Sequence, residues 1–106
     1  MSATPVAERD VERYLVRRCE ALGWEIRKLK WIGRIGAPDR LVLATRRDKE
    51  DHLEGVVLFV ELKAPGQKLR IAQEREHARM RAARANVFMV DSLTAVDSLI
   101  WDTLHP

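Results

Sequence analysis

The feature that most constrains the fold is the segment VVLFVELK (56–63), in which five consecutive apolar residues lead directly into Glu61, Leu62 and Lys63. A short apolar run that ends at Ala-Pro-Gly is typical of a strand buried on both faces of a sheet. Because side chains alternate along a strand, Glu61 and Lys63 project from one face and Leu62 projects from the other, into the core. The two charges form either a plain salt bridge or part of a functional site.

The remaining sequence predicts helices and further strands around this segment. Gly23 ends a helical pattern that Thr4-Pro5 begins, and Asp91 or Ser92 caps the last helix. The polar segment 46–55 predicts a solvent-exposed turn. In chain order, the predicted elements are a helix over 6–22, strands over 24–30, 39–45 and 56–63, a helix over 69–84, a strand over 86–91 and a helix over 93–104.

This α-β-β-β-α-β-α order indicates an α/β domain over residues 1–106, with a mixed central sheet flanked by helices. The chain has 46% apolar and 33% charged residues, which is ordinary for a globular protein. It has no apolar stretch long enough for a membrane span and no visible signal peptide. The single Cys19 predicts a quietly packed thiol in a reducing compartment. We therefore expect a cytoplasmic location and no membrane partner.

The strand over 39–45 suggests what the charges at the end of the apolar strand do. If the two strands pair across the intervening turn, Asp39 lies beside Glu61, and two adjacent carboxylates repel each other unless a hard cation lies between them. Mg²⁺ or Mn²⁺ suits oxygen ligands, and no Cys or His is placed to favour zinc. With Lys63 next to it, such an ion is suited to phosphodiester hydrolysis, because the cation activates water and the lysine orients or deprotonates it.

Several longer motifs resemble the VRR-NUC branch of the PD-(D/E)XK nuclease superfamily, whose short stand-alone members imply a bacterial cell or a phage-infected host cell. They are GRIGAPDRLVL (33–43), FVELKAPGQKL (59–69) and VFMVDS (87–92), and the spacing agrees over roughly residues 8–104. The resemblance implies a nuclease that depends on Mg²⁺ (or Mn²⁺) and uses no organic cofactor. It implies Asp39, Glu61 and the backbone carbonyl of Leu62 as metal ligands, and Lys63 as the catalytic lysine.

The resemblance also implies a glutamate from the first helix. Glu12, eleven residues before Gly23, is the predicted catalytic residue and metal ligand, and Glu8, one turn earlier on the same face, is the competitor. Gln73 matches a helical glutamine of the family and is expected to hold Lys63 or a metal-bound water, the alternative being a surface residue. Candidate DNA-phosphate contacts, or else simple surface charges, are Arg34, Arg40, Lys68 and Arg70.

Glycine positions carry further expectations. Gly33 and Gly36 are expected to take positive φ or to let the backbone approach DNA. Relatives tend to have a glycine before the last strand, where this chain has Arg84-Ala85-Asn86, so Asn86 is expected to keep the left-handed turn.

The predicted function is structure-specific endonuclease activity on branched DNA, either four-way junctions or flaps. Cutting a junction symmetrically needs two sites related by a two-fold axis, so a homodimer is expected. Trp24, Trp31 and the segment 98–106 offer apolar surface for the dimer contact. The alternatives are a sequence-specific restriction-type endonuclease and a non-catalytic nucleic-acid-binding module on the same fold.

Overall fold

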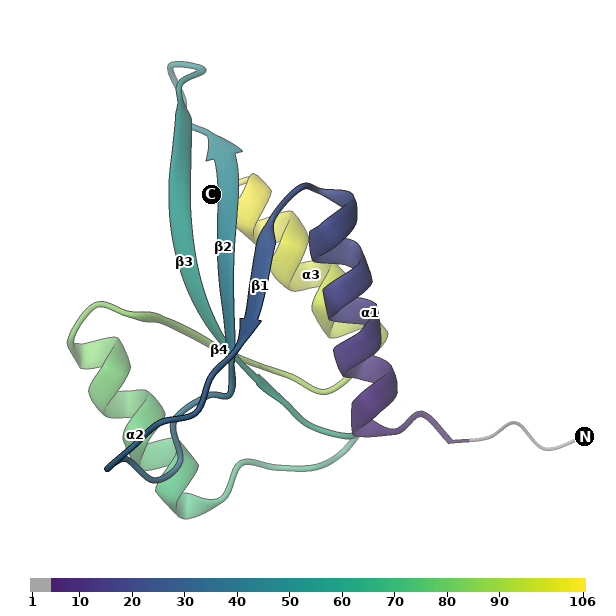
Figure 1. Cartoon of the computed structure of the whole chain (residues 1–106), viewed down its shortest axis with the longest axis vertical. Helices are drawn as coiled ribbons and strands as arrows, with labels where there is room; N and C mark the ends of the chain where they lie inside the picture. Colours follow the sequence, from purple (N-terminus) through teal and green to yellow (C-terminus); the bar gives the residue numbers. More distant parts are fainter. Residues whose placement is uncertain (1–4) are drawn as a thin grey trace, which may run out of the picture.

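A computed structural model describes residues 5–106 and has the predicted order of elements (Figure 1). The mixed sheet flanked by helices confirms the predicted fold class. No helix in the described part of the chain is long and apolar enough to cross a membrane. The helices are α1 (Glu8–Ala21), α2 (Ile71–Ala82) and α3 (Leu93–Leu104), and the strands are β1 (Glu25–Lys28), β2 (Arg40–Arg47), β3 (Leu53–Leu62) and β4 (Asn86–Val90).

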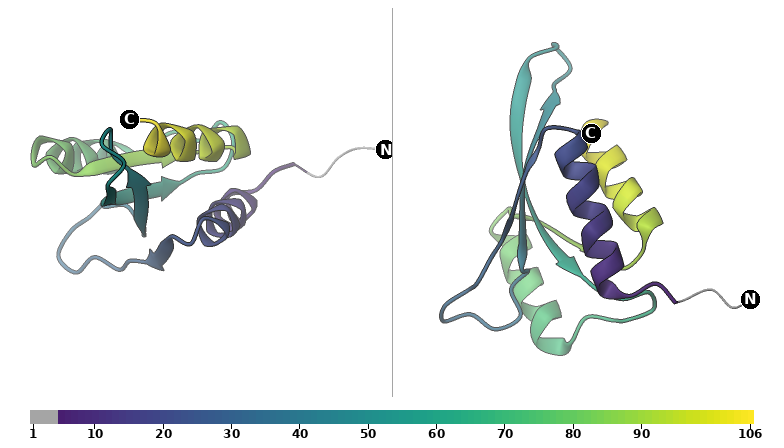
Figure 2. Two further views of the ribbon diagram at one scale, coloured as in Figure 1. Left: turned by 90° about the horizontal axis from the view of Figure 1, so that it is seen from above. Right: turned by 45° about the vertical axis from the view of Figure 1, so that its right-hand side comes forward.

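The sheet has the order β1-β2-β3-β4. The chain runs antiparallel from β1 through β3, and β4, which follows the crossover through α2, pairs parallel to β3. α1 and α3 lie side by side against the sheet, whereas α2 packs against β4 (Figures 1 and 2). This arrangement places the end of β3 between α2 and the first turn of α1.

The core lies between the sheet and the pair α1 and α3. Even-numbered side chains of the two central strands point into it, and Leu62 is among them, as predicted. Glu61 and Lys63 have the opposite parity, so they leave the strand on the other face. Cys19 is buried in this core, as expected, and its burial raises the pKa of its thiol to about 11. The core residues of the central strands are Val42, Ala44, Leu58, Val60 and Leu62.

The hairpin between β2 and β3 is longer than predicted. The strands continue to Arg47 and resume at Leu53, so only 48–52 form the turn. Polar residues extend the ladder there, because an ion pair between Arg46 and Glu54 links the two strands at 2.7 Å and Arg46 also donates to the Thr103 carbonyl of α3. β3 is consequently buried on both faces only towards its end, not over its whole length.

Helix ends also differ from the prediction. α1 begins at Glu8, so Pro5 lies before the helix rather than in its first turn, and Thr4 lies outside the described residues. The Asp10 carboxylate instead accepts the Ala7 backbone N–H at 2.8 Å. At the start of α3 the predicted cap is confirmed, because Ser92 Oγ accepts the Ala95 N–H at 2.9 Å.

Two other local expectations are wrong. Arg84, at φ 71°, takes the left-handed position after α2, whereas Asn86 begins β4 and donates its side-chain N–H to the Val57 carbonyl. Trp24 offers no apolar surface, because it is buried and its indole N–H bonds to the Thr45 carbonyl. Trp31 is only partly exposed, since it packs against Phe59 and donates to the Pro38 carbonyl.

Candidate active site

The strand register places the two predicted metal-binding carboxylates opposite each other. The antiparallel ladder ends with the pair Arg40 and Val60, so Asp39 and Glu61 are the next residues of the two segments, and the charge of Asp39 acts on Glu61. Directly opposed residues of an antiparallel pair have their side chains on one face, with Cβ atoms about 5 Å apart. The neighbouring strand holds Asp39 in place, because its carbonyl accepts the Leu29 N–H at 2.7 Å.

Glu61 and Asp39 have few neighbouring groups that stabilise their negative charges. Glu61 is only 8% exposed, and its pKa is raised to about 7, mainly by burial and then by the negative charge of Asp39. The ammonium of Lys63 opposes this rise, and the charge of Glu8 adds to it. In Asp39, the Oδ1 atom is buried and accepts no hydrogen bond.

These residues fit a hard divalent cation. A buried carboxylate oxygen without a donor and a second carboxylate forced towards its protonated form are both costly, and one ion between them would remove both penalties. Lys63 is 8% exposed and lies on the same face, and its backbone N–H bonds to the Val90 carbonyl at 3.0 Å. The end of β3 is therefore fixed by β4 on one side and by β2 on the other.

The two helix carboxylates have different surroundings. Glu12 is ion-paired with Arg40 at 3.0 Å and lies 4.0 Å from the Lys28 ammonium. Glu8 forms no ion pair with a described residue, yet its charge acts on Glu61. The end of β3 lies beside the first turn of α1 (Figures 1 and 2), which agrees with the action of the Glu8 charge on Glu61.

Gln73 makes a contact that the prediction did not anticipate. Its side-chain carbonyl accepts the Arg70 backbone N–H at 2.9 Å and so caps the start of α2. Gly36, at φ 86°, lies against the same turn, where a Cβ atom would come within 2.5 Å of the Ala72 carbonyl oxygen. The positive φ expected at Gly33 and Gly36 is confirmed, and the close approach of Gly36 is to α2.

Two of the four predicted phosphate contacts are engaged within the protein. Arg40 holds Glu12, and Arg34 forms a bidentate pair with Glu76, with one N–O distance of 3.1 Å. Lys68 and Arg70 form no ion pair with any residue in the range 5–106.

Sequence reasoning missed the polar residues of α2 that support this corner. Glu76 is buried, and hydrogen bonds from Arg34 and then Arg79 lower its pKa to about 2. His77 is fully buried, neither ring nitrogen has a hydrogen-bond partner of good geometry, and burial lowers its pKa. The spacing of Glu76 and Arg79 along one helix signals their pair, but nothing in the sequence connects Glu76 to Arg34, 42 residues away.

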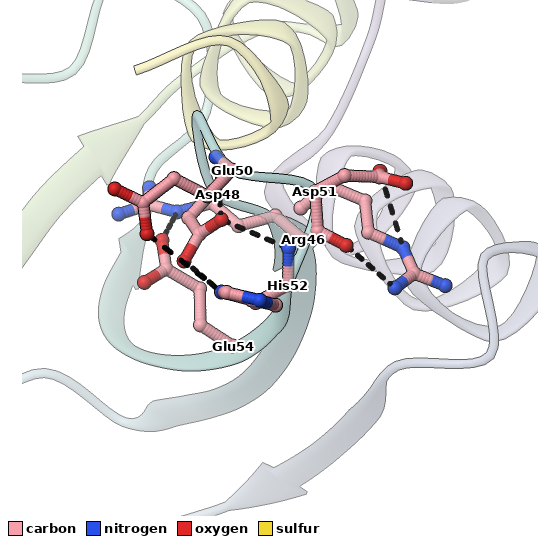
Figure 3. A network of polar contacts seen from close by, with 7 residues as sticks. Arg46, Asp48, Glu50, Asp51, His52 and Glu54 are labelled. Atoms are coloured by element: carbon pink, nitrogen blue, oxygen red, sulfur yellow. Dashed lines mark hydrogen bonds and ion pairs between the residues drawn. The ribbon is translucent and has the colours of Figure 1, made fainter.

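A second group of metal-binding residue types lies at the tip of the β2–β3 hairpin (Figure 3). Ligand atoms of Asp48, Glu50 and His52 lie within 4.8 Å of one another. Here Asp48 Oδ1 accepts the backbone N–H groups of Glu50 and His52, both at 2.9 Å, so it closes the turn. The tip is about 26 Å along the strands from Asp39, so it is separate from the Asp39–Glu61 corner.

The fold and the paired carboxylates define the class, an α/β domain of the PD-(D/E)XK nuclease type. A solved structure titled VRR_NUC domain is 45% identical to this chain, with a TM-score of 0.73, and the match covers 88% of this chain and 92% of that one. "Putative nuclease p44" of Acyrthosiphon pisum secondary endosymbiont phage 1 is 38% identical over 87 residues, 82% of this chain and 85% of the phage protein. No protein-family model matches the chain. The chain belongs to the VRR-NUC family.

Proposed function

We propose that the protein is a Mg²⁺- or Mn²⁺-dependent endonuclease that hydrolyses DNA phosphodiester bonds. The observation that carries this proposal is the buried, donor-free oxygen of Asp39 opposite Glu61, whose pKa is raised to about 7. Asp39, Glu61 and the carbonyl of Leu62 would hold the ion. When bound, the ion would neutralise charge on the phosphoryl oxygens and activate water.

Lys63 has the role of orienting the attacking water and the scissile phosphate. It shares a face with Glu61 and is nearly as buried, so its ammonium has few directions in which to point. Gln73 supports the site indirectly in this proposal, because its capping of α2 fixes the helix against which Gly36 and the loop before Asp39 pack.

We propose branched DNA as the substrate and a homodimer as the active form. A single site cuts one strand, so symmetric cutting of a junction needs a second copy. Exposed apolar side chains support self-association, since Trp101 is 64% exposed on α3 and Ile32 and Ile35 are almost fully exposed in the loop before Asp39.

The decisive experiment compares cleavage of a four-way junction, a flap, a fork, a plain duplex and an RNA–DNA hybrid of matched sequence, in Mg²⁺, Mn²⁺ and EDTA. We expect cleavage only with a divalent ion and fastest on the junction or the flap. Equal cutting of every substrate would contradict the structure-specific part, and no cutting of any would contradict the nuclease. Sedimentation at the same protein concentration would show whether the active species is a dimer.

The helix carboxylate needs its own test, because α1 offers two. Glu12 must exchange its ion pair with Arg40 for the cation, whereas Glu8 need not. Glu8→Gln and Glu12→Gln remove one charge each at equal size. A loss of about 100-fold or more in cleavage on Glu12→Gln supports the predicted ligand, and the same loss on Glu8→Gln assigns the role to Glu8.

A further inference from the structure

An open groove of about 670 Å³ runs along the outer side of α1, next to the start of α3. Arg9, Arg13 and Arg17 line it from α1, and Arg40 lines it from the start of β2. Residues four apart on a helix share one face and are separated by about 6 Å along the axis, so the three α1 arginines form one stripe, inclined to the helix axis and about 12 Å long along it. We call this the α1 stripe.

The α1 stripe is available for a ligand. Arg9, Arg13 and Arg17 are exposed, and none of them forms an ion pair with an acidic residue among the described residues. The groove also contains Asp10 and Glu12, but these acids are already engaged, by the Ala7 N–H and by Arg40 respectively. Four arginines against two acids leave a net charge of +2 within the groove.

The groove begins beside the candidate active site. Arg40 lines the groove from the α1 face of the sheet, where it holds Glu12, whereas Asp39 and Glu61 lie on the other face. The first turn of α1 lies close to the end of β3 (Figure 1). Glu8, whose charge acts on Glu61, directly precedes Arg9 at the near end of the stripe, so a strand whose phosphate lies at Asp39 and Glu61 can pass the first turn of α1 to reach the stripe.

We infer that the α1 stripe binds the phosphate backbone of the DNA strand that enters the active site, an inference that rests on the proposed nuclease function. The stripe is long enough for its three guanidinium groups to contact about two or three successive phosphates of one DNA strand. Guanidinium groups are well suited to phosphate oxygens. We assign phosphate binding to the stripe because Arg34 and Arg40 are already paired with Glu76 and Glu12.

The test is the salt dependence of binding to the branched DNA that the wild type cleaves, measured with Ca²⁺ in place of Mg²⁺. Arg13→Gln with Arg17→Gln should reduce the slope of log affinity against log salt by about 1.8, which means that the wild type loses about 12-fold more affinity between 50 and 200 mM salt. Arg47→Gln with Lys49→Gln, at the hairpin tip, removes the same charge and should leave the slope unchanged. Arg13→Lys with Arg17→Lys keeps the charge and should retain most of the slope.

A second measurement needs no protein variant. Neutral methylphosphonate linkages placed one at a time along the substrate should weaken wild-type binding most at about two to five phosphates from the cut. An unchanged slope in Arg13→Gln with Arg17→Gln, or a methylphosphonate profile with no such position, overturns the inference while cleavage by the wild type still stands. Failure of the wild type to bind or cut DNA overturns both the inference and the proposed function.

Discussion

The two ends of the β2–β3 hairpin carry similar residues in opposite circumstances. At the tip, Asp48 and Glu50 lie with His52 in a solvated turn, and Asp48 already accepts two backbone N–H groups. At the other end, Asp39 and Glu61 are held together in the interior, where one oxygen has no donor and the Glu61 pKa is raised to about 7. Backbone N–H groups of the turn satisfy Asp48 at the tip, whereas the buried end has an oxygen without a donor, which the proposed cation would satisfy. Burial, rather than the residue types, distinguishes the two.

The largest expected effect separates the two ends by activity. Asp39→Asn should reduce cleavage by about 100-fold or more, because it removes the charge of the proposed metal ligand at constant size. Asp48→Asn, the same change at the tip, should leave cleavage within about two-fold. Initial rates on the preferred DNA substrate at saturating Mn²⁺ give the comparison, and binding in Ca²⁺ shows that Asp39→Asn still holds DNA. Equal losses in both variants would contradict the distinction.

The next largest effect is on stability, and it concerns the loop that precedes Asp39. Gly36→Ala should lower the free energy of unfolding by about 3 kcal/mol, because the residue has φ 86° and its Cβ would lie 2.5 Å from the Ala72 carbonyl oxygen. Gly33→Ala is the matched control, since it has φ 78° but open space around the added atom, and it should cost only about 1–2 kcal/mol. Urea denaturation measures both, and equal costs would show that the contact with α2 is unimportant.

The stability of the buried end should also depend on pH. The pKa of Glu61 is about 7 in the folded protein against 4.5 for an ordinary glutamate, so the folded state binds this proton more tightly. The contribution of Glu61 to the free energy of unfolding is therefore fully present below pH 4.5. It falls as the pH rises towards 7, by at most about 3 kcal/mol in EDTA. Asp39 and Glu8 raise this pKa and Lys63 lowers it.

The measurement is the difference in unfolding free energy between the wild type and Glu61→Gln, followed from pH 4.5 to 8. We expect the difference to grow in favour of the variant as the pH rises in EDTA, and to shrink when Mn²⁺ is added. A difference that is flat with pH would contradict the buried, charged-pair description of this corner.

The smallest effect is expected at the tip. His52→Ala should change the free energy of unfolding by less than about 0.5 kcal/mol, because the side chain is 75% exposed and its carboxylate neighbours lie 3.7 and 3.8 Å away in solvent. Mn²⁺ titration by calorimetry should give the same site number and affinity as the wild type. Loss of a Mn²⁺ site in this variant would show that the metal binds at the tip and not at the buried end.

Much of the site's arrangement could be read from local pattern. The apolar run before Glu61 identified a buried strand, and its alternation placed Leu62 in the core and the two charges on the other face. The antiparallel pairing that sets Asp39 opposite Glu61 follows from two strands joined by one polar turn. These features depend on neighbours in sequence or on a short hairpin, where periodicity is informative.

The polar partners could not be read in this way. Arg34 and Arg40 stand in motifs that suggest phosphate contacts, yet Glu76 and Glu12 hold them in the folded protein. Gln73 was assigned towards Lys63 but caps its own helix. Long side chains reach several positions, and the choice among them depends on which distant carboxylate the fold brings near.

The sequence by itself determined the element order, the buried strand and the pair of acids at its end, because these are encoded in local periodicity and in the register of one hairpin. Only the tertiary structure decided which arginines remain available, since the fold brings Arg34 to Glu76 of α2 and Arg40 to Glu12 of α1, residues far apart in the chain. The engaged Arg34 and Arg40 and the exposed stripe of α1 differ in their surroundings, and the free energy of a charge depends on those surroundings rather than on residue type.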